Sequence, residues 1–310
     1  MENRIEIINL VAEKERLTNE LKNLIYGSVE IREVKEKKYI YVHYREEKIV
    51  FTKYLGEYSD TLYNLILKNN IKAKELKKEI KRINKELKVF GYMESEITDK
   101  VASNIDFAKR HMVDSIYKQA ILEGIATTYA DTETIIEGGK VNNMTGKDVL
   151  KVVNLKHAWE FILNKNVING PTNYSLLCEI NRLIEEGFYY NAGRVRSTPV
   201  SIGGTNWRPE LPIEGIVKEE LSNILNSNLK IVDKAIELLL FIMKKQIFID
   251  GNKRTAVIFA NHLLISNAKG LIVIPNDRVE EYRKLLIAYY EGKDELKIKD
   301  FLKKVAYKEI

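Results

Sequence analysis

The chain has 310 residues, 45% of them hydrophobic, so it is long enough to bury the core of one or two domains. Charged residues make up 30% and the formal net charge is +6, which fits either a solvated basic surface or an anionic partner. A single cysteine, Cys178, excludes an intramolecular disulfide and fits a reducing compartment. The first residues have no apolar signal core, and no uncharged stretch is long enough for a bilayer. We therefore predict a cytoplasmic protein with no membrane contact.

The first part of the chain predicts two helices around a small sheet. Residues 5–25 place leucines on one helical face, and Gly27 ends that pattern. Residues 29–55 are rich in strand-forming side chains on both sides of a polar turn at 45–48, which predicts a β-hairpin or a three-stranded meander. A second helix over residues 71–89 carries apolar residues at heptad-like spacing: Leu76, Ile80, Ile83 and Leu87.

These two helices leave two arrangements open. They can pair with each other as a short coiled-coil arm, or each can pack as an amphipathic helix on its own domain. A coiled-coil arm would also allow a homodimer. We predict an N-terminal arm over residues 1–92, made of a helix, a small β-hairpin and a helix, followed by a main domain over residues 93–310.

The main domain is predicted to be mainly α. One segment departs from this pattern: residues 193–213 are rich in glycine and proline and predict a hairpin loop. Apolar residues recur with the helical period in the segments 100–122, 146–164, 173–186, 216–245, 253–268 and 278–304.

A polar loop that begins at Gln246 joins two strongly apolar helices, which must lie centrally in a bundle. Gly251 lets the backbone turn tightly, and the free N–H groups at the start of the next helix form an anion site. Lys253 and Arg254 add positive charge for phosphate oxygens. Asp250 would repel phosphate unless it holds a divalent cation. The loop predicts a site for a magnesium nucleotide, and the alternative is an ordinary interhelical turn with solvated Lys253 and Arg254.

The sequence here resembles the Fic family, whose signature is His-x-Phe-x-(Asp/Glu)-Gly-Asn-(Gly/Lys)-Arg. Upstream, Glu123 and the glycine after it are similar to the end of the family's inhibitory motif, Ser/Thr-x-x-x-Glu-Gly/Asn, with Gln119 in the first place. Residues 193–212 resemble the family's flap, and the whole resemblance covers residues 93–305. The matching positions of the signature are Phe248, which looks like an apolar pin for the loop, Asp250, Gly251, Asn252, Lys253 and Arg254.

The resemblance implies a helical bundle with a β-hairpin flap. It also implies transfer of a nucleotide moiety, usually AMP from ATP, to a hydroxyl side chain of another protein. By position, Asp250 would hold Mg2+, while Asn252 and the backbone after Gly251 would cradle the α-phosphate.

The same resemblance assigns roles around the outer phosphates and the target. Lys253 and Arg254 would meet the outer phosphates, and Glu123 would enter the site and oppose productive placement of the γ-phosphate. The flap, residues 199–213, would dock an unidentified target protein by strand addition.

Three positions depart from the family pattern. Gln246 stands where the family has its catalytic histidine; a glutamine amide cannot accept a proton usefully, and losing a general base costs about a hundred- to ten-thousandfold in rate. Val257 replaces the second arginine of many members, so Glu123 loses its expected partner. Lys253, where AMP-transferring members often have glycine, resembles the Doc branch, which transfers phosphate.

Three functions follow as hypotheses. The first is a Fic-type enzyme with weakened or altered transfer, of AMP or of phosphate. The second is a non-catalytic nucleotide sensor, or pseudoenzyme, that keeps the loop but has lost the base. The third is a regulator that binds nucleic acid through the basic and aromatic residues 28–56. We predict that His262 is a core histidine rather than a replacement base, and that Trp207 packs the flap.

Overall fold

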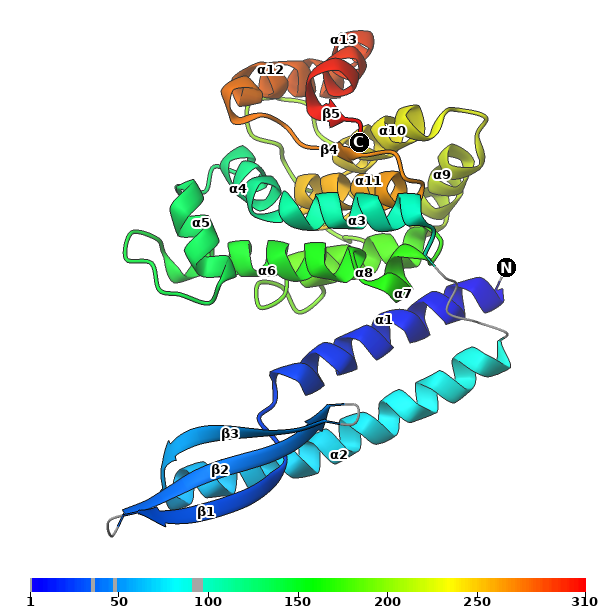
Figure 1. Cartoon of the computed structure of the whole chain (residues 1–310). Helices are drawn as coiled ribbons and strands as arrows, with labels where there is room; N and C mark the ends of the chain where they lie inside the picture. The colour runs from blue at the N-terminus through cyan, green and yellow to red at the C-terminus, as the bar shows by residue number, and fades with distance from the viewer. Residues whose placement is uncertain (1, 35–36, 47–48, 91–96) are drawn as a thin grey trace. The chain divides into compact units, whose positions relative to one another are not determined.

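The computed structural model describes residues 2–34, 37–46, 49–90 and 97–310. The chain divides into two compact units, residues 1–93 and 94–310, close to the predicted boundary between residues 92 and 93 (Figure 1). Across the described ranges, no helix is both long enough and apolar enough to cross a membrane.

The first unit contains an antiparallel sheet in the order β1-β2-β3, which is the meander of the two predicted alternatives. Ile40 and Val42 are fully buried on one face of this sheet and pack on Ile66 of α2. Residues 47 and 48 of the predicted turn lie outside the described residues. The elements of this unit are α1 (Glu2–Asn23), β1 (Ser28–Val34), β2 (Lys37–Glu46), β3 (Ile49–Glu57) and α2 (Asp60–Val89).

The two helices of the first unit pack side by side, with Leu76, Ile83 and Leu87 of α2 buried. The heptad-like positions are therefore used within the chain, and a homodimer stays a prediction. α2 begins at Asp60 rather than at residue 71, because the Ser59 hydroxyl accepts the Leu62 N–H at 3.2 Å and caps the helix.

The other face of the sheet carries a cluster of tyrosines. Tyr41 and Tyr54 face each other across β2 and β3 with ring centroids 5.3 Å apart, and Tyr39 lies 6.1 Å from Tyr54. The Arg32 guanidinium sits 4.5 Å from the Tyr41 ring. Nucleic-acid binding through residues 28–56 remains a prediction that rests on this basic and aromatic composition.

The second unit is mainly helical, as predicted. Its centre is α11, in which every residue from Arg254 to Ile265 is buried, packed against α10 and α8. Its elements are α3 (Asp99–Arg110), α4 (Met112–Leu122), α5 (Tyr129–Ile136), α6 (Gly146–Ile162), α7 (Lys165–Ile168), α8 (Tyr174–Ile184), α9 (Glu214–Asn226), α10 (Ile231–Lys245), α11 (Asn252–Ser266), β4 (Leu271–Ile272), α12 (Val279–Tyr290), α13 (Glu295–Phe301) and β5 (Tyr307–Lys308).

Three predicted helices are divided in the structure. The segment 100–122 breaks at His111 into α3 and α4, and 216–245 breaks at 227–230 into α9 and α10. The segment 278–304 breaks after Tyr290, where Gly292 and Asp294 take left-handed backbone conformations with φ of 78° and 53°. Apolar periodicity continues through such breaks because both halves of each pair face the same core.

The predicted hairpin at 193–213 is an irregular loop, and the structure shows no strand within these residues, all of which it describes. Three prolines, Pro199, Pro209 and Pro212, cannot donate backbone hydrogen bonds to a ladder. A small sheet forms elsewhere instead, where β4 pairs antiparallel with β5.

Candidate functional site

The loop from Gln246 to Gly251 connects α10 to α11 through two left-handed residues. Gln246 ends α10 with φ of 47° and ψ of 60°, and Gly251 begins α11 with φ of 74°. In the described part of the chain no side chain caps the N-terminus of α11, so the N–H groups of its first turn are open to an external acceptor. The chain thus presents the positive end of a buried helix at this loop.

Asn252 holds the loop together from inside. Its Oδ1 accepts the Phe248 N–H at 2.9 Å, and its Nδ2 donates to the Phe248 carbonyl at 2.8 Å and to Gln246 Oε1 at 3.2 Å. Phe248 is fully buried, as expected of an apolar pin. Because the Asn252 amide is occupied within the loop, a phosphate would meet the backbone of the first turn rather than this side chain.

The side chain of Gln246 is turned back onto α10. Its Nε2 donates to the Met243 carbonyl at 2.6 Å, and its Oε1 accepts from Asn252. The amide therefore ties the end of one helix to the start of the next. In this arrangement each end of the amide already makes one hydrogen bond within the protein.

Asp250 and Gly251 are fixed from α8. Asn181 Nδ2 donates to the Asp250 carbonyl at 3.0 Å and to Thr255 Oγ1 at 3.1 Å. Asp250 Oδ1 accepts the Gly251 N–H at 2.6 Å, while 48% of the Asp250 side chain stays exposed. This carboxylate is half open to solvent and is the one that a divalent ion could reach from outside.

Gly251 is required both by its backbone and by its surroundings. A Cβ there would collide with Glu185 Oε1 and lie 3.1 Å from Asn181 Nδ2. The positive φ adds strain for any other residue.

We expect Gly251→Ala to destabilise the second unit by about 1–3 kcal/mol and to weaken anion binding at the loop. Urea unfolding followed by tryptophan fluorescence measures this, because both tryptophans, Trp159 and Trp207, lie in the second unit. The matched control is Gly215→Ala in α9, where a Cβ meets nothing within 4 Å. An equally small effect of both substitutions would contradict the tight loop.

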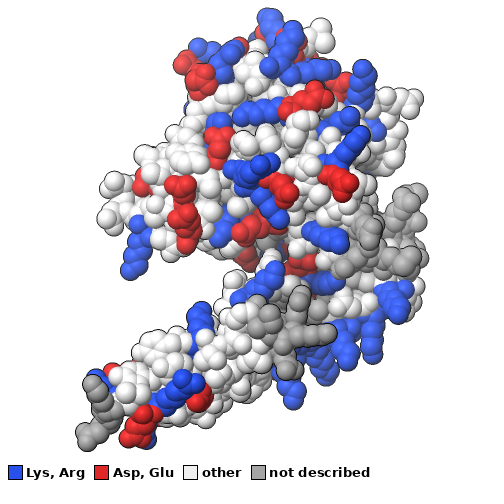
Figure 2. Space-filling view, in the orientation of Figure 1, with Lys and Arg blue, Asp and Glu red and all other residues white. Residues whose placement is uncertain are grey.

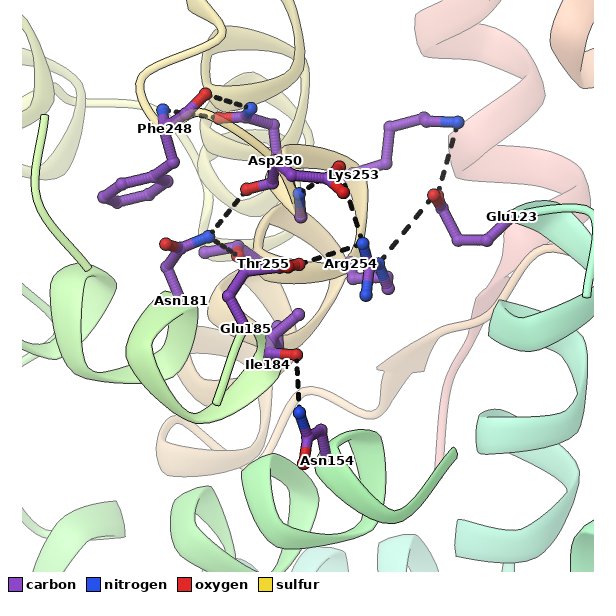
Figure 3. A network of polar contacts seen from close by, with 12 residues as sticks. Glu123, Asn154, Asn181, Ile184, Glu185, Phe248, Asp250, Lys253, Arg254 and Thr255 are labelled. Carbon is purple, nitrogen blue, oxygen red and sulfur yellow. Dashed lines mark hydrogen bonds and ion pairs between the residues drawn. The ribbon is translucent and has the colours of Figure 1, made fainter. Parts of the chain in front are cut away.

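Arg254 lies at the centre of a cluster of charged side chains and is itself buried, with 3% of its side chain exposed (Figure 3). Its Nη2 is 2.9 Å from Glu185 Oε1 and 3.5 Å from Asp250 Oδ1, and its Nε is 3.8 Å from Glu123 Oε2. Nε and Nη1 of Arg254 are nonetheless buried without a hydrogen-bond partner in the described part of the chain. These two guanidinium nitrogens therefore lack an acceptor oxygen, which a ligand could supply only by displacing the side chains that cover them.

Sequence reasoning missed Glu185, which follows α8 and is 1% exposed. Burial raises the pKa of this carboxyl to about 7; Arg254 opposes the shift, whereas Asp250 and Glu123 add to it. Asn154 of α6 anchors this turn through the Ile184 carbonyl at 3.0 Å. The signal available in the sequence was a pair of polar residues, Asn181 and Glu185, one helical turn apart on a face of α8 that is otherwise apolar.

The structure places Glu123 at the loop, where it pairs with Lys253 at 3.3 Å and with Arg254. Its expected arginine partner is replaced by Val257, which is buried in the core. Arg283 fixes the end of α4 by donating to the Leu122 carbonyl at 2.7 Å. The carboxylate of Glu123 thus faces the two cations that were predicted to meet outer phosphates.

Gln119, one turn before Glu123, ties α4 to the core. Its Oε1 accepts from Trp159 Nε1 at 2.8 Å, and its Nε2 donates to the Arg254 carbonyl at 3.4 Å. The residue in the Ser/Thr place of the inhibitory motif is therefore a buried contact between α4, α6 and α11.

Arg196 joins the loop to the flap, a role that the sequence did not reveal. It is 2% exposed, and its Nε donates to the Gln246 carbonyl at 2.6 Å while its Nη2 donates to the Glu210 carbonyl at 2.6 Å. Its backbone N–H also donates to the Ile247 carbonyl at 3.0 Å. Trp207 stacks on Tyr290 with centroids 5.7 Å apart, which confirms that it packs the flap.

His262 and Cys178 lie outside this cluster of contacts. His262 is fully buried between the Val167 carbonyl at 3.0 Å and the Thr172 hydroxyl at 2.9 Å, and burial lowers its pKa to about 4. It is a core histidine, as predicted. Burial raises the pKa of Cys178 to about 11, so its thiol stays protonated at neutral pH.

Within the described residues, no group of three or more His, Cys, Asp or Glu side chains is arranged to hold a metal ion. A divalent ion at Asp250 would therefore need oxygens from a ligand or from water to complete its coordination. Mg2+ commonly binds in this way, through one or two carboxylates together with substrate phosphates.

Comparison with known protein families matches residues 171–264, which include α8, the flap and the loop, to the Fic/DOC family. The curated proteins contain no match to this chain.

Among solved structures, the chain is similar to Fic-1 (residues 134–508) from C. elegans, with 16% identity, a TM-score of 0.52 and coverage of 78% of this chain and 79% of that chain. It is also similar to a Fic-domain-containing signalling protein from Bacteroides thetaiotaomicron, with 21% identity, a TM-score of 0.51 and coverage of 62% and 76%. A Fic family protein from Desulfovibrio desulfuricans gives 15% identity, a TM-score of 0.51 and coverage of 68% and 73%. These likenesses show that the chain has the fold of Fic proteins.

Proposed function

We propose that this chain binds a magnesium nucleotide at the loop between α10 and α11 and transfers a nucleotidyl group, AMP from ATP, to a protein hydroxyl at a low rate. One observation carries the proposal. Arg254 is buried beside the N-terminus of α11 and the half-exposed carboxylate of Asp250. Among the described residues, its Nε and Nη1 have no hydrogen-bond partner, and no side chain caps that helix terminus. A buried cation, open backbone N–H groups and an accessible carboxylate together fit the phosphates of a nucleotide with its divalent ion.

Different residues would bind different parts of the nucleotide. The backbone N–H groups of Asn252 and Lys253 would receive a phosphate at the helix terminus, and the side chains of Lys253 and Arg254 would receive the outer phosphates. Asp250 would hold Mg2+, which when bound neutralises charge on the phosphates and the leaving group. In the transfer, the target hydroxyl oxygen bonds to the α-phosphorus, the bond to the β-phosphate oxygen breaks, pyrophosphate leaves and the hydroxyl proton needs an acceptor.

Gln246 does not supply the proton acceptor that this transfer needs. An amide does not accept a proton at neutral pH, and both ends of this amide are already bonded within the protein. The same observation favours a second candidate function, a nucleotide-binding pseudoenzyme that senses nucleotide without transferring it. Transfer of phosphate in place of AMP, as in the Doc branch, is the third outcome that a product analysis would identify.

Glu123 is the candidate inhibitory residue of either function. Its carboxylate pairs with Lys253 and lies near Arg254. An outer phosphate must therefore displace this carboxylate in order to bind both cations. The segment 199–213 is the candidate docking surface for the target protein. It is held at its base by Arg196, which also bonds the loop, so the flap and the phosphate site share one anchor.

The test combines calorimetry with intact-mass spectrometry on the full chain. We expect ATP with Mg2+ to bind the unmodified protein, to bind Asp250→Ala more weakly, and to give a slowly formed adduct of AMP mass on the protein or on a lysate target. Asp106→Ala, an exposed acid on α3, is the matched control and should bind as the unmodified protein does. Binding without any adduct would favour the sensor, and no binding by any form would overturn the nucleotide site.

Nucleotide affinity should also depend on the protonation of Glu185. When this carboxyl loses its proton it becomes a charged competitor for Arg254, so affinity falls as pH rises through its pKa of about 7. From pH 6 to pH 8 we expect a loss of about fivefold if a bound phosphate raises this pKa by about one unit. Calorimetry with Mg2+ and ATP measures it.

Glu185→Gln is the control for this pH dependence. The titration of ATP itself affects both proteins, so the difference between them isolates Glu185. Equal pH dependence in the two proteins would show that Glu185 does not compete with the ligand.

A further inference from the structure

The outer face of α2 carries a row of lysines that the nucleotide site does not use. The row consists of Lys74, Lys78, Lys81, Lys85 and Lys88, and all five are exposed. Steps of three and four residues keep these side chains on one side of a helix. We call this set the lysine row.

The net charge of the molecule is concentrated in the unit that contains this row. Residues 1–93 hold 20 basic and 15 acidic residues, whereas residues 94–310 hold 30 and 29, so the first unit accounts for +5 of the total of +6. Within α2, residues 68–88 include nine lysines and arginines but three glutamates. Figure 2 shows basic side chains gathered over the C-terminal half of α2.

The lysine row differs in its pairing from three other cations of α2, namely Lys72, Lys77 and Arg82. Lys72 pairs with Glu20, and Arg82 bridges Glu79 and Glu86 at 2.5 Å each. Lys77 lies over the Tyr26 ring at 4.5 Å. Within the described ranges, no lysine of the row makes a hydrogen bond or an ion pair. Like charges at this spacing destabilise a helix, so the row favours an external anion.

The packing of α1 on α2 holds the lysine row in a fixed line. The apolar positions Leu76, Ile83 and Leu87 are buried on the opposite side of the helix, which prevents α2 from rotating about its axis. The rise from Lys74 to Lys88 is about 21 Å at 1.5 Å per residue. Over that length of duplex axis one strand has about six phosphates, one for each 3.4 Å of rise, so the row and a phosphodiester strand carry charge at similar density per length of axis.

A lipid surface fits this face less well. Helices that lie on membranes insert an apolar face beside their lysines. Here the exposed large apolar residues of α2 lie outside 72–88, at Leu65, Leu67, Ile71 and Val89. The apolar positions between them are buried, except Ile80, which is partly buried. The row presents charge without an inserting face.

We propose that the lysine row is a sequence-independent binding surface for the phosphate backbone of a double-stranded nucleic acid. The surface is distinct from the tyrosine face of the sheet and from the loop at Gln246. Its contacts go to phosphates, so it gives affinity and salt dependence and leaves sequence selection to other parts of the molecule.

The test is fluorescence anisotropy of labelled 20-base-pair DNA and RNA duplexes with the full chain over a series of salt concentrations. Five phosphate contacts predict a slope of about −4.5 in log affinity against log salt on DNA. Lys74→Gln/Lys81→Gln/Lys88→Gln should bring this slope to about −2 and weaken binding at low salt. The stronger-bound duplex identifies which backbone the surface prefers.

The matched control is Lys284→Gln/Lys297→Gln/Lys304→Gln, which removes the same charge from exposed, ion-paired lysines of the second unit. It should leave the slope unchanged. Glutamine is a good helix former and relieves repulsion, so the α2 variant should keep its helical circular dichroism. Equal loss in both variants, no binding to either duplex, or tighter binding to anionic vesicles or polyglutamate than to the duplexes would overturn the proposal.

Discussion

Replacing Gln246 with histidine should raise the rate of AMP transfer by about a hundred- to ten-thousandfold, the usual contribution of a general base. The position accepts the change, because histidine is among the residues that tolerate the left-handed backbone found there, with φ of 47°. An imidazole titrates near neutral pH and can take the proton that the attacking hydroxyl releases. Intact-mass spectrometry after incubation with Mg2+ and ATP, sampled over time, measures the rate of adduct formation.

Gln246→Met is the matched control for this gain. Methionine has nearly the same length but no proton acceptor of use, so it should lose the contacts to Met243 and Asn252 without gaining transfer. A higher rate of transfer in both variants would mean that the rate rises because the Gln246 amide is removed, not because a base is added. If the histidine variant binds ATP and gains nothing, the transferase proposal fails and the nucleotide sensor remains.

The second large effect is expected from Arg254→Gln. Removing this guanidinium leaves Glu185 buried without its counter-ion, and at pH 8 we expect the second unit to lose about 3 kcal/mol of stability. Urea unfolding monitored by tryptophan fluorescence measures this loss. Nucleotide affinity should fall as well, because the buried donors are gone.

The destabilisation should shrink towards pH 5.5. Burial raises the pKa of Glu185 to about 7, so below that value the folded protein keeps a neutral carboxyl that needs no counter-ion. In the unmodified protein the raised pKa of Glu185 makes stability depend on pH. Between pH 4.5 and about 7 the folded state holds this proton and the unfolded state does not, so the free energy of unfolding falls as pH rises through that range.

A double substitution separates the charge from the packing. Arg254→Gln/Glu185→Gln should recover most of the stability lost at pH 8, because no unpaired charge remains in the buried site. Lys284→Gln, which breaks an exposed ion pair with Glu280, should cause no measurable change. Equal destabilisation at pH 5.5 and pH 8, without recovery in the double variant, would show that Arg254 acts through packing alone.

The residues of the site differ in how far the sequence alone identifies them. Asp250, Gly251, Asn252, Lys253 and Arg254 are contiguous, and the prediction that they form an anion loop follows from local rules for glycine, helix termini and charge. Their partners are not contiguous. Glu185 and Asn181 come from another helix, and no periodicity connects them to the loop.

Helix boundaries show the same division. The helical character of the second unit follows from apolar spacing, but the breaks at His111 and at 227–230 do not, because each is made by local backbone conformation between two segments that share one core. The flap was expected to form a hairpin, and Arg196 instead binds its backbone carbonyls while three prolines supply no donors. Side chains replace a strand ladder there.

The sequence by itself determined the mainly α class and an N-terminal arm of two helices around a small sheet, and it predicted a phosphate-type loop, because short-range propensity and a run of adjacent residues specify each of them. Only the tertiary structure decided that Gln246 is tied back to Met243 and Asn252, that Glu123 reaches Lys253, and that Arg254 lies beside a buried Glu185. These contacts depend on how helices pack across long separations in the chain. The free energy of burying and pairing such charges arises only once that packing exists.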